Sequence, residues 1–469
     1  MSAAEQALTT ARLGETLAGQ GRWDDAAAAF RQALAVLPRD ALLHNNLAFV
    51  LFQGGQADAA IPEFEQALAL DPDLLAAHSG VAFARLSKGD QAGAITAFRE
   101  VVRLDPQQVQ ARMALYQLLQ VAQQPAEALA HQAAALEVCQ LFSNPCTGPA
   151  PAASLLVLKA PGDLQTNIPL DLLFDRARYT LHDLYVVEGR NPPAPASLPP
   201  YDLVFNAISE SERALPALAA AERFIAGQPK PALNPPALVR RLSRDNAPLL
   251  FAGIDGCCCP PTLRMSRAAL LAEPPLAVLE RHGMNLPIVI RPLASHAGVD
   301  LERIETAAAL DAYLARVTPA EYYVSPFVDY RSADGHYRKY RVMFVDGAPY
   351  PCHLAISRRW MIHYLNADMA EFAWMREEEA RFLADLSSVF TGRAGAALTA
   401  IAARCGLDYC GMDCAITPDG DVLVFEIDAA MLVHLWDPID VYPYKHQYVP
   451  RIFRAVERLV ADRIRPSAP

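Results

Sequence analysis

The sequence predicts a multidomain protein in which an α-helical solenoid is followed by an α/β region and then by an α+β region. Three observations lead to this fold class. Phe and Pro residues recur every 34 positions in the first third of the chain, and apolar runs alternate with helical segments after residue 150. Two tight-turn signals, Asp346-Gly347 and Asp419-Gly420, then separate long apolar strands. With 469 residues, 52% of them hydrophobic, the chain has material for several cores.

The repeat is defined by three positions that recur with a period of 34 residues. They are Ala26, Ala60 and Ala94; Phe30, Phe64 and Phe98; and Pro38, Pro72 and Pro106. In a helix-turn-helix unit, the small Ala lets two helices approach, the Phe fills the space to the next unit, and the Pro cannot continue the helix before it. A Gly closes the first helix of each unit: Gly21, Gly55 and Gly89.

Residues 7–108 resemble the tetratricopeptide-repeat (TPR) family, whose Ala-x-x-x-Phe and terminal Pro coincide with these positions. A fourth unit at 109–142 keeps Ala128 but has Gln132 in place of the Phe, as expected of a capping repeat. We therefore expect residues 1–142 to form a TPR-like domain with a protein or peptide partner on its concave side. The side chains expected on that side are His44, Asn45, Phe49 and Gln53. A purely structural or dimerising solenoid is the alternative.

Helical periodicity ends at Ser143-Asn144-Pro145, which predicts a linker at 143–154. The pattern that follows, at 155–284, favours a small parallel sheet flanked by helices. Its apolar runs are 155–160, 183–187 and 201–208, with a helical stretch at 213–227.

Longer strands joined by turns are predicted from residue 285 to residue 465. These strands cover 287–292, 322–328 and 337–357, and the last of them turns at Asp346-Gly347. Between this hairpin and the next, residues 376–406 show apolar positions at helical spacing.

Two carboxylates, Asp413 and Glu426, are equidistant from Asp419-Gly420. If these two residues form a two-residue hairpin loop, the carboxylates lie directly opposite each other, with Cβ atoms about 5 Å apart, and Asp428 lies diagonal to Asp413. Three acidic groups on one face repel one another unless a cation lies among them, and oxygen ligands favour Mg²⁺. The pattern predicts a magnesium site, and a solvated hairpin with scattered acids is the alternative.

The opposite face of this hairpin is predicted to be its core side. Its residues are Cys410, Met412, Cys414 and Ile416 against Leu423, Phe425 and Ile427. Period-two alternation of this kind supports the register.

Basic residues gather shortly before the acidic hairpin, in a chain whose formal net charge is −11. They are Arg331, Arg338, Lys339, Arg341, Arg358 and Arg359. Alternation places Lys339 and Arg341 on one strand face and Arg338 on the other, so one set is expected to line a cleft. Neutralisation of this kind suits a polyphosphate ligand.

These motifs together resemble the ATP-grasp superfamily of carboxylate-amine ligases. A strand ending in Arg291 precedes a small-residue loop with Ser295 and Gly298, where that family has its phosphate-covering loop. The segment YVSPFVDY (323–330) corresponds to the hinge that holds adenine through main-chain groups, and YRKYRVMFVDG resembles the strand whose Arg reaches phosphate. The acidic hairpin resembles the metal-binding signature.

The resemblance implies ATP and Mg²⁺ as cofactors, with a pre-ATP-grasp domain at 155–284 and the ATP-grasp fold at 285–465. The implied nucleotide-binding residues are Arg291, Ser295, Gly298, Ser325, Phe327, Lys339 and Asn366; the implied catalytic residues are Arg338, Arg341 and Arg359; and the implied metal ligands are Asp413, Glu426 and Asp428.

The implied reaction joins an amino acid or small amine to a carboxylate or peptide substrate through an acyl phosphate, while the loop at 293–299 excludes water. Two alternatives stay open. In one, the TPR array is an interaction scaffold and the nucleotide fold is silent; Pro326, the single loop glycine and Asp428 at a position where Asn is usual favour it. In the other, the protein is an ATP-grasp kinase.

Composition narrows the class of protein further. The negative net charge argues against nucleic-acid binding, and we find no targeting segment or membrane span, so a cytoplasmic protein is expected. The nine cysteines lack the paired spacing of zinc sites and are expected to be free thiols.

Overall fold

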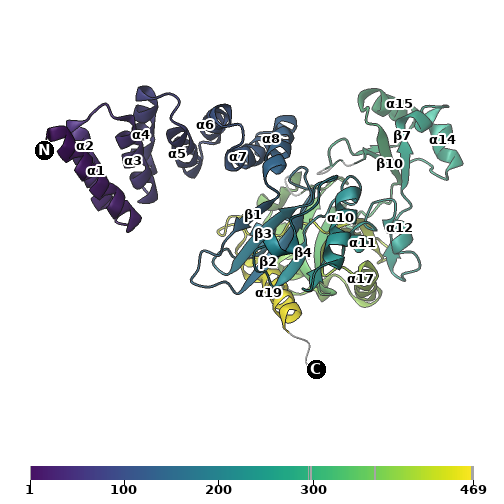
Figure 1. Cartoon of the computed structure of the whole chain (residues 1–469). Coiled ribbons are helices and arrows are strands. Elements are labelled where there is room, and N and C mark those ends of the chain that lie inside the picture. The colour runs from purple at the N-terminus through teal and green to yellow at the C-terminus, as the bar shows by residue number, and fades with distance from the viewer. Residues whose placement is uncertain (1, 294, 296–297, 364–365, 466–469) are drawn as a thin grey trace. The chain divides into compact units, whose positions relative to one another are not determined.

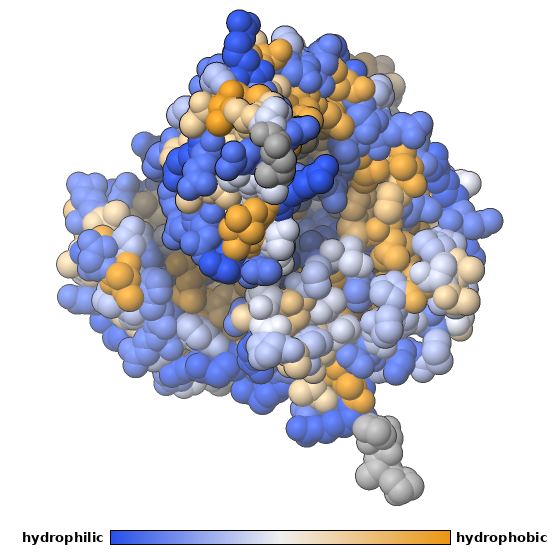
Figure 2. Space-filling model, turned by 60° about the vertical axis from the view of Figure 1, so that its left-hand side comes forward, coloured by the Kyte–Doolittle hydropathy of each residue, from blue (hydrophilic) through white to orange (hydrophobic). Residues whose placement is uncertain are grey.

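The computed structural model describes residues 2–465 except 294, 296–297 and 364–365. The chain divides into two compact units (Figure 1). The first contains the residues up to Gln140 together with Pro161–Leu164, and the second contains Leu141–Ala160 and the residues from Gln165 onward. None of the helices in these described ranges is long and apolar enough to cross a lipid bilayer. The face of the molecule in Figure 2 is largely hydrophilic, with apolar areas between the polar ones.

Consecutive helix pairs build the first unit. They are α1 (Ala3–Gly19) with α2 (Trp23–Val36), α3 (Ala41–Gln53) with α4 (Ala57–Leu70), α5 (Leu75–Ser87) with α6 (Gln91–Leu104), and α7 (Val109–Val121) with α8 (Pro125–Val138). Short connections make neighbouring helices antiparallel. The helix-turn-helix repeat predicted from the 34-residue period is therefore confirmed, including its fourth unit.

The repeated residues form the core of this unit. Ala26, Ala60, Ala94 and Ala128 are 0% exposed, and Phe30, Phe64 and Phe98 are 1% exposed. Gly21, Gly55 and Gly89 have φ between 73° and 78°, in the left-handed region that Gly adopts without a steric penalty. In the fourth unit, Gln123 takes this conformation, and Gln132 is buried at the Phe position, where it accepts a hydrogen bond from the Gly162 N–H at 2.9 Å.

A side-chain hydrogen bond that the 34-residue period did not predict stabilises the connections between successive repeats. The carbonyl oxygens of Pro38 and Pro72 accept hydrogen bonds from His44 and His78 at 3.2 and 2.8 Å. In the fourth unit, the carbonyl oxygen of Pro106 accepts one from Arg112 at 2.6 Å. Each donor lies six residues after its Pro, so a side chain near the start of the next helix closes the loop.

The second unit begins with a mainly parallel sheet in the order β1-β3-β2-β4-β5. Its strands are β1 (Leu141–Asn144), β2 (Ala153–Lys159), β3 (Tyr179–Tyr185), β4 (Leu203–Asn206) and β5 (Ala232–Leu233). Only β1 pairs antiparallel within these strands, with β3. The small parallel sheet predicted here is confirmed, but β1 shows that the first residues of the predicted linker are part of it.

A second sheet is antiparallel, in the order β7-β10-β8-β9. Its strands are β7 (Leu263–Ser266), β8 (Ile288–Pro292), β9 (Glu302–Ile304) and β10 (Glu321–Pro326). It has its own apolar core, which includes Leu279, Leu310 and Tyr322.

A third sheet carries both predicted hairpins, in the order β12-β11-β13-β14-β6. Its strands are β6 (Cys257–Cys258), β11 (Tyr337–Val345), β12 (Ala348–Ser357), β13 (Tyr409–Ile416) and β14 (Val422–Asp428). Asp346 and Gly347 form the predicted two-residue loop, with φ of 50° and 74°. Because β6 and β7 join the later sheets, the sheets do not divide at the predicted boundary of 284/285.

The helices of the second unit complete its layers (Figure 1). They are α9 (Leu170–Leu173), α10 (Leu215–Ala226), α11 (Pro236–Val239), α12 (Ala247–Leu250), α13 (Arg267–Leu270), α14 (Pro275–Arg281), α15 (Ala307–Arg316), α16 (Ala373–Ala384), α17 (Gly392–Cys405), α18 (Pro443–Tyr448) and α19 (Pro450–Ile464). One apolar core lies against both the first and the third sheet.

Asn234 connects these two sheets. It is fully buried, with φ of 54°, and its side chain bonds both the N–H and the carbonyl of Tyr409 at 2.8 and 2.9 Å. Its own N–H donates to the Asp408 carboxylate at 2.8 Å. The start of β13 is thereby fixed against the end of β5, and β13 carries Asp413.

We expect Gly80→Ala to destabilise the repeats by about 1–3 kcal/mol, because its Cβ would lie 2.2 Å from the Phe64 ring in a packed core. Gly19→Ala is the matched control, since nothing lies within 4 Å of its Cβ. Thermal unfolding followed by circular dichroism at 222 nm measures both. Equal melting profiles for the two variants would contradict the packing described here.

Candidate functional site

The acidic hairpin has the register that the sequence predicts at its carboxylates. Asp413 pairs with Glu426, and Gly411 pairs with Asp428. The predicted two-residue loop, however, is wrong. The Gly420 N–H bonds the carbonyl of Thr417, and the Thr417 N–H bonds that of Asp421, both at 2.9 Å, so the loop has three residues.

A β-bulge restores the register. The three-residue loop shifts the pairing by one position, so that Cys414 pairs with Val424. The ladder shifts back between Asp413 and Cys414, where Phe425 is the additional residue of β14. The two deviations cancel, and the carboxylates face each other as they would across a two-residue loop.

The bulge also changes which face two apolar residues occupy. Leu423 and Phe425 pack in a cluster with Tyr330 and Tyr337, not in the core that contains Cys410, Met412 and Cys414. The prediction that they lie on the core side is wrong, because a one-residue shift moves a side chain to the other face.

Asp413 is held by two cations on β11. Arg341 is its direct cross-strand neighbour and binds it bidentately, at 2.7 and 3.0 Å, and Lys339 Nζ donates to it at 2.9 Å. Asp413 is only 2% exposed. Burial opposes its ionisation, but the charges of Arg341 and Lys339 outweigh burial and hold the pKa of Asp413 below its usual range.

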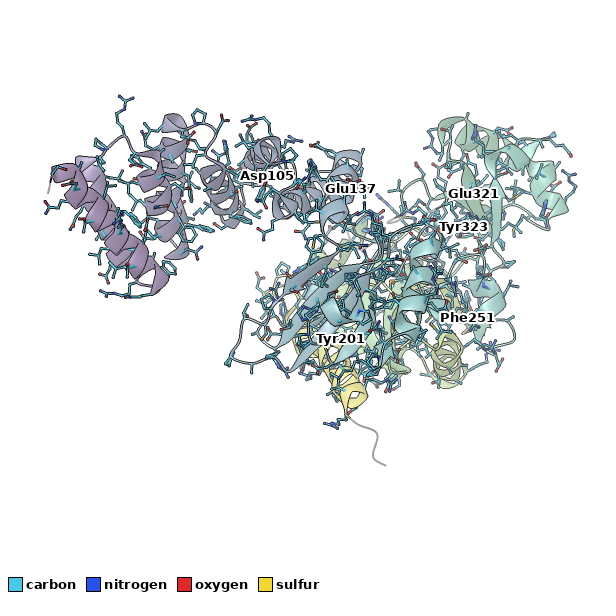
Figure 3. All side chains as sticks on the ribbon, viewed as in Figure 1. Asp105, Glu137, Tyr201, Phe251, Glu321 and Tyr323 are labelled. Carbon is cyan, nitrogen blue, oxygen red and sulfur yellow. The ribbon has the colours of Figure 1, made fainter. Side chains whose placement is uncertain are left out.

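Glu426 is paired with a residue that the sequence analysis missed, Arg244. Arg244 donates to Glu426 and lies 3.7 Å from a carboxylate oxygen of Glu212. Burial alone would raise the pKa of Glu426. The positive charges of Arg244, Arg291 and Lys339 outweigh burial, Arg244 most of all, so the pKa of Glu426 is lowered. Tyr323 on β10, labelled in Figure 3, donates to Glu212 at 2.7 Å and links the second sheet to this chain of charges.

Asp428 has no cation in direct contact among the described residues. Its side chain accepts a hydrogen bond from the Ala430 N–H at 2.8 Å. Burial and the neighbouring charge of Glu426 raise the pKa of Asp428 to about 7, although the Ala430 N–H opposes this. A cation beside this carboxylate would remove the cost of ionising it.

Glu426 and Asp428 line a small cavity, whereas Asp413 does not. The residues that line this cavity are Gln165, Ser209, Glu210, Ser211, Glu212, Leu242, Arg244, Glu426, Ile427 and Asp428. Ser209–Glu212 follow β4, so the carboxyl end of a parallel strand contributes to the cavity, as is common for ligand sites of α/β sheets. The sequence signal for these residues was the acidic pair Glu210 and Glu212 directly after an apolar strand.

The side chains available as ligands limit how the predicted magnesium ion could be held. In the part of the chain that the structure describes, no group of three or more His, Cys, Asp or Glu side chains is arranged to hold a metal. Both carboxylate oxygens of Asp413 accept hydrogen bonds from Arg341 and Lys339. Mg²⁺ commonly takes one or two carboxylates and completes its shell with water and substrate phosphates. Glu426 and Asp428 fit that smaller role.

The predicted nucleotide-binding residues lie around the same region. Burial and the charge of Arg244 lower the pKa of Arg291 to about 10, and Arg291 donates to the hydroxyl of Ser295 at 3.0 Å. Ser325 is paired with Val289 in the second sheet. The loop residue Gly298, with φ of 75°, approaches Met361 so closely that an added Cβ would lie 3.1 Å from its sulfur. Three residues of the predicted lid, at 294 and 296–297, lie outside the described residues.

A second cavity, of about 460 Å³, lies beside this region and is lined mainly by basic and aromatic residues. Its lining is Arg303, Arg331, Gly335, Tyr337, Arg358, Arg359, Trp360, Met361 and Asn366. Two predicted site residues, Arg359 and Asn366, are therefore together. The Phe327 ring packs against both Arg303 and Trp360, at 4.1 and 5.6 Å, while its N–H is bonded to the Pro287 carbonyl.

His363 lies next to Asn366, which lines the second cavity. Its N–H donates to the Asn366 side chain at 2.8 Å. Burial and the positive charges of Lys339 and Arg341 lower the pKa of His363.

Arg338 is the predicted catalytic residue that the structure does not bring to this site. It lies on the other face of β11, where it forms ion pairs with Asp334 at 2.8 Å and Glu378 at 2.5 Å. The strand alternation that separates Arg338 from Lys339 and Arg341 is thus observed.

Comparison with known proteins concerns the first unit. The sequence profile of the family described as "Tetratricopeptide repeat" matches residues 12–74. The N-terminal helices are TPR-type repeats, and a mixed α/β region with several sheets follows them. The search of curated proteins found no match.

Three solved structures illustrate the likeness. A crystal structure of MamA is 22% identical, with 28% of this chain and 77% of MamA covered and a TM-score of 0.28. The first TPR of Spaghetti (RPAP3), bound to an HSP90 peptide, is 22% identical, with 26% and 95% covered and a TM-score of 0.25. YrrB, described as a TPR protein with an unusual peptide-binding site, is 20% identical, with 27% and 64% covered and a TM-score of 0.25. The ATP-grasp resemblance of the second unit stays a prediction.

We expect Asp413→Asn to lower the free energy of unfolding of the second unit by about 3 kcal/mol, because Arg341 and Lys339 lose the charge that compensates them. Asp462→Asn, which removes an exposed partner of Arg465, should change it by less than about 0.5 kcal/mol. Urea unfolding followed by tryptophan fluorescence is suitable, since Trp360, Trp374 and Trp436 all lie in this unit. An unchanged midpoint for Asp413→Asn would show that the ion pairs do not form.

Proposed function

We propose that the second unit is an ATP- and Mg²⁺-dependent carboxylate-amine ligase that forms an amide bond through an acyl phosphate. One observation carries the proposal: Arg341, Asp413 and Glu426 are direct neighbours across three paired strands. A cation and two carboxylates in one row suit a site that would hold both anionic phosphate oxygens and a divalent cation that neutralises them.

The surrounding cations suit a nucleotide. Arg291 on the second sheet and Lys339 and Arg341 on the third present positive charge from both sheets. The acid-rich side, with Glu426 and Asp428, would hold Mg²⁺. When bound, that ion would neutralise charge on the β- and γ-phosphates. Asp413 would keep Lys339 and Arg341 in position, since it binds both.

The chain's residues would then support two displacements. A carboxylate oxygen of the substrate attacks the γ-phosphorus, the bond from that phosphorus to the bridging oxygen breaks, and ADP leaves. The amine nitrogen next attacks the acyl carbon and loses a proton, and inorganic phosphate leaves. Lys339 and Arg341 lower the repulsion between the anionic substrate and ATP, and the loop held by Arg291 and Ser295 would exclude water.

The second candidate is an interaction scaffold whose nucleotide-binding fold has no catalytic activity, and a specific observation favours it. Both carboxylates of the row already have protein cations as partners, Arg341 and Lys339 on Asp413 and Arg244 on Glu426. In that case the protein would act as an interaction scaffold through its repeats.

We propose that the TPR unit binds a protein or peptide segment, whichever candidate holds for the second unit. Phe49 and Phe83 occupy the same repeat position, 34 residues apart, and are 47% and 43% exposed. Leu8 and Leu42 form a second exposed pair with the same spacing. Equivalent positions lie on one face of a solenoid, so each pair of apolar side chains is available for contact with a bound segment. Asn45, expected on the same side, is instead buried.

The ligase proposal predicts ADP release that requires both a carboxylate and an amine. Glu426→Ala should reduce the rate about 100-fold or more, because a ligand of the Mg²⁺ that would neutralise the charge of the transition state is lost. Glu377→Gln, an exposed carboxylate on α16, is the matched control and should retain the parent rate. A coupled ADP assay over amino acids and short peptides measures this.

Three results would redirect the assignment. Equal rates of ADP release for Glu426→Ala and the parent would show that Glu426 is not part of the active site. Nucleotide binding without turnover would favour the silent scaffold, and a stable phosphorylated hydroxyl product would identify a kinase.

The TPR proposal predicts that Phe49→Ala/Phe83→Ala weakens binding of a selected peptide by about 10-fold or more, through the loss of two large apolar contacts. Val36→Ala, an equally exposed apolar residue on a second helix, should bind like the parent. Peptides selected by display on the intact protein, followed by fluorescence anisotropy, provide the measurement. Selection of peptides whose binding is insensitive to the Phe variants would place the contact surface elsewhere.

A further inference from the structure

The cavity of about 460 Å³ defined above, which we call the arginine pocket, has four guanidinium groups and no acidic side chain among the described residues that line it. Residues from the second and third sheets meet there. Arg303 comes from β9, Tyr337 from the start of β11, and Arg358 follows β12. In a chain with a formal net charge of −11, such a concentration of cations around one cavity indicates an anionic ligand.

Two of the four charges are compensated by protein groups. Arg303 forms an ion pair with Glu305 at 2.7 Å, and Arg331 lies 3.6 Å from Asp329. Arg358 and Arg359 are exposed, and among the described residues neither has an ion-pair partner. The pocket therefore carries about two uncompensated positive charges.

The compensated arginines are held in place by aromatic rings. Arg303 stacks over Phe327 at 4.1 Å, and Arg331 lies over Tyr337 at 5.3 Å and donates to its hydroxyl at 3.0 Å. Arg303 Nε is buried and has no hydrogen-bond partner in the described part of the chain. Planar guanidinium groups fixed in this way can bind carboxylates bidentately at little further entropic cost.

The pocket lies close to the proposed site of phosphoryl transfer. Tyr337 and Lys339 share one face of β11, which separates their Cα atoms by roughly 7 Å. A ligand anchored by the arginines would therefore need to extend by only a few bonds to reach Lys339.

We propose that the arginine pocket binds the carboxylate substrate, and that this substrate carries at least two carboxylates a few bonds apart. The arginines anchor one carboxylate, and the other extends toward Lys339 and Arg341, where it is activated. A free dicarboxylic acid and a peptide that ends in Glu or Asp both offer this chemistry. The role of the second carboxylate rests on the proposed ligase function, whereas binding in the pocket does not.

Binding is tested on the intact protein without nucleotide, by isothermal titration calorimetry. The probes are glutarate, butyrate, a short peptide ending in Glu, and the same peptide ending in Gln amide. Glutarate or the Glu peptide should bind at least about 10-fold more tightly than its singly charged or neutral counterpart, since charge-assisted hydrogen bonds to a second carboxylate are lost. Which of the two binds better identifies the source of the dicarboxylate.

The variants Arg358→Gln and Arg359→Gln should each weaken that binding about 10-fold, and both side chains are exposed, so folding should not be affected. Arg458→Gln, an exposed arginine on α19, is the matched control. Equal affinity for glutarate and butyrate, binding unchanged in both variants, or tighter binding of inorganic phosphate than of glutarate would overturn the proposal. Dicarboxylate binding without any ADP release would support the pocket and reject the ligase.

Discussion

The second unit depends on one row of cross-strand contacts, in which Arg341, Asp413 and Glu426 are neighbours on three paired strands. Buried carboxylates are tolerated only when their charge is compensated. Arg341 and Lys339 compensate Asp413, and Arg244 compensates Glu426. Because Arg244 also lies near Glu212, this row ties the third sheet to the segment that follows β4.

The row also divides the acidic residues by role. Asp413 is neutralised by its own strand neighbours and positions two cations. Glu426 and Asp428 instead line a cavity, and burial, together with the neighbouring charge of Glu426, raises the pKa of Asp428 to about 7. A ligand that brings positive charge to this cavity would meet Asp428 and Glu426, the latter already paired with Arg244, while an anionic group would meet Arg244 in the same cavity and the cations of β11 beyond β13.

Predictions that depended on the 34-residue period were accurate. The 34-residue period located the helix pairs, the buried Phe residues and the left-handed glycines, since each repeat contacts only its neighbours. Strand alternation correctly separated Arg338 from Lys339 and Arg341. The loop at Asp419-Gly420 was predicted with the wrong length, and the carboxylate register was right only because a bulge at Phe425 offset the error. Leu423 and Phe425 were misplaced for the same reason.

By itself, the sequence determined the TPR repeats and the order of the strands in the two hairpins, because these depend on local spacing and on neighbours in the chain. The pairing of Asp413 with Glu426 also required the bulge at Phe425, which local spacing does not reveal. Only the tertiary structure decided that Arg244, Glu212 and Tyr323 join the carboxylates, and that Arg303 meets Arg358 around one pocket. Those residues are separated by tens to hundreds of positions, so no period relates them. The first and third sheets share a core, and the charged groups buried beside it need partners wherever the fold supplies them.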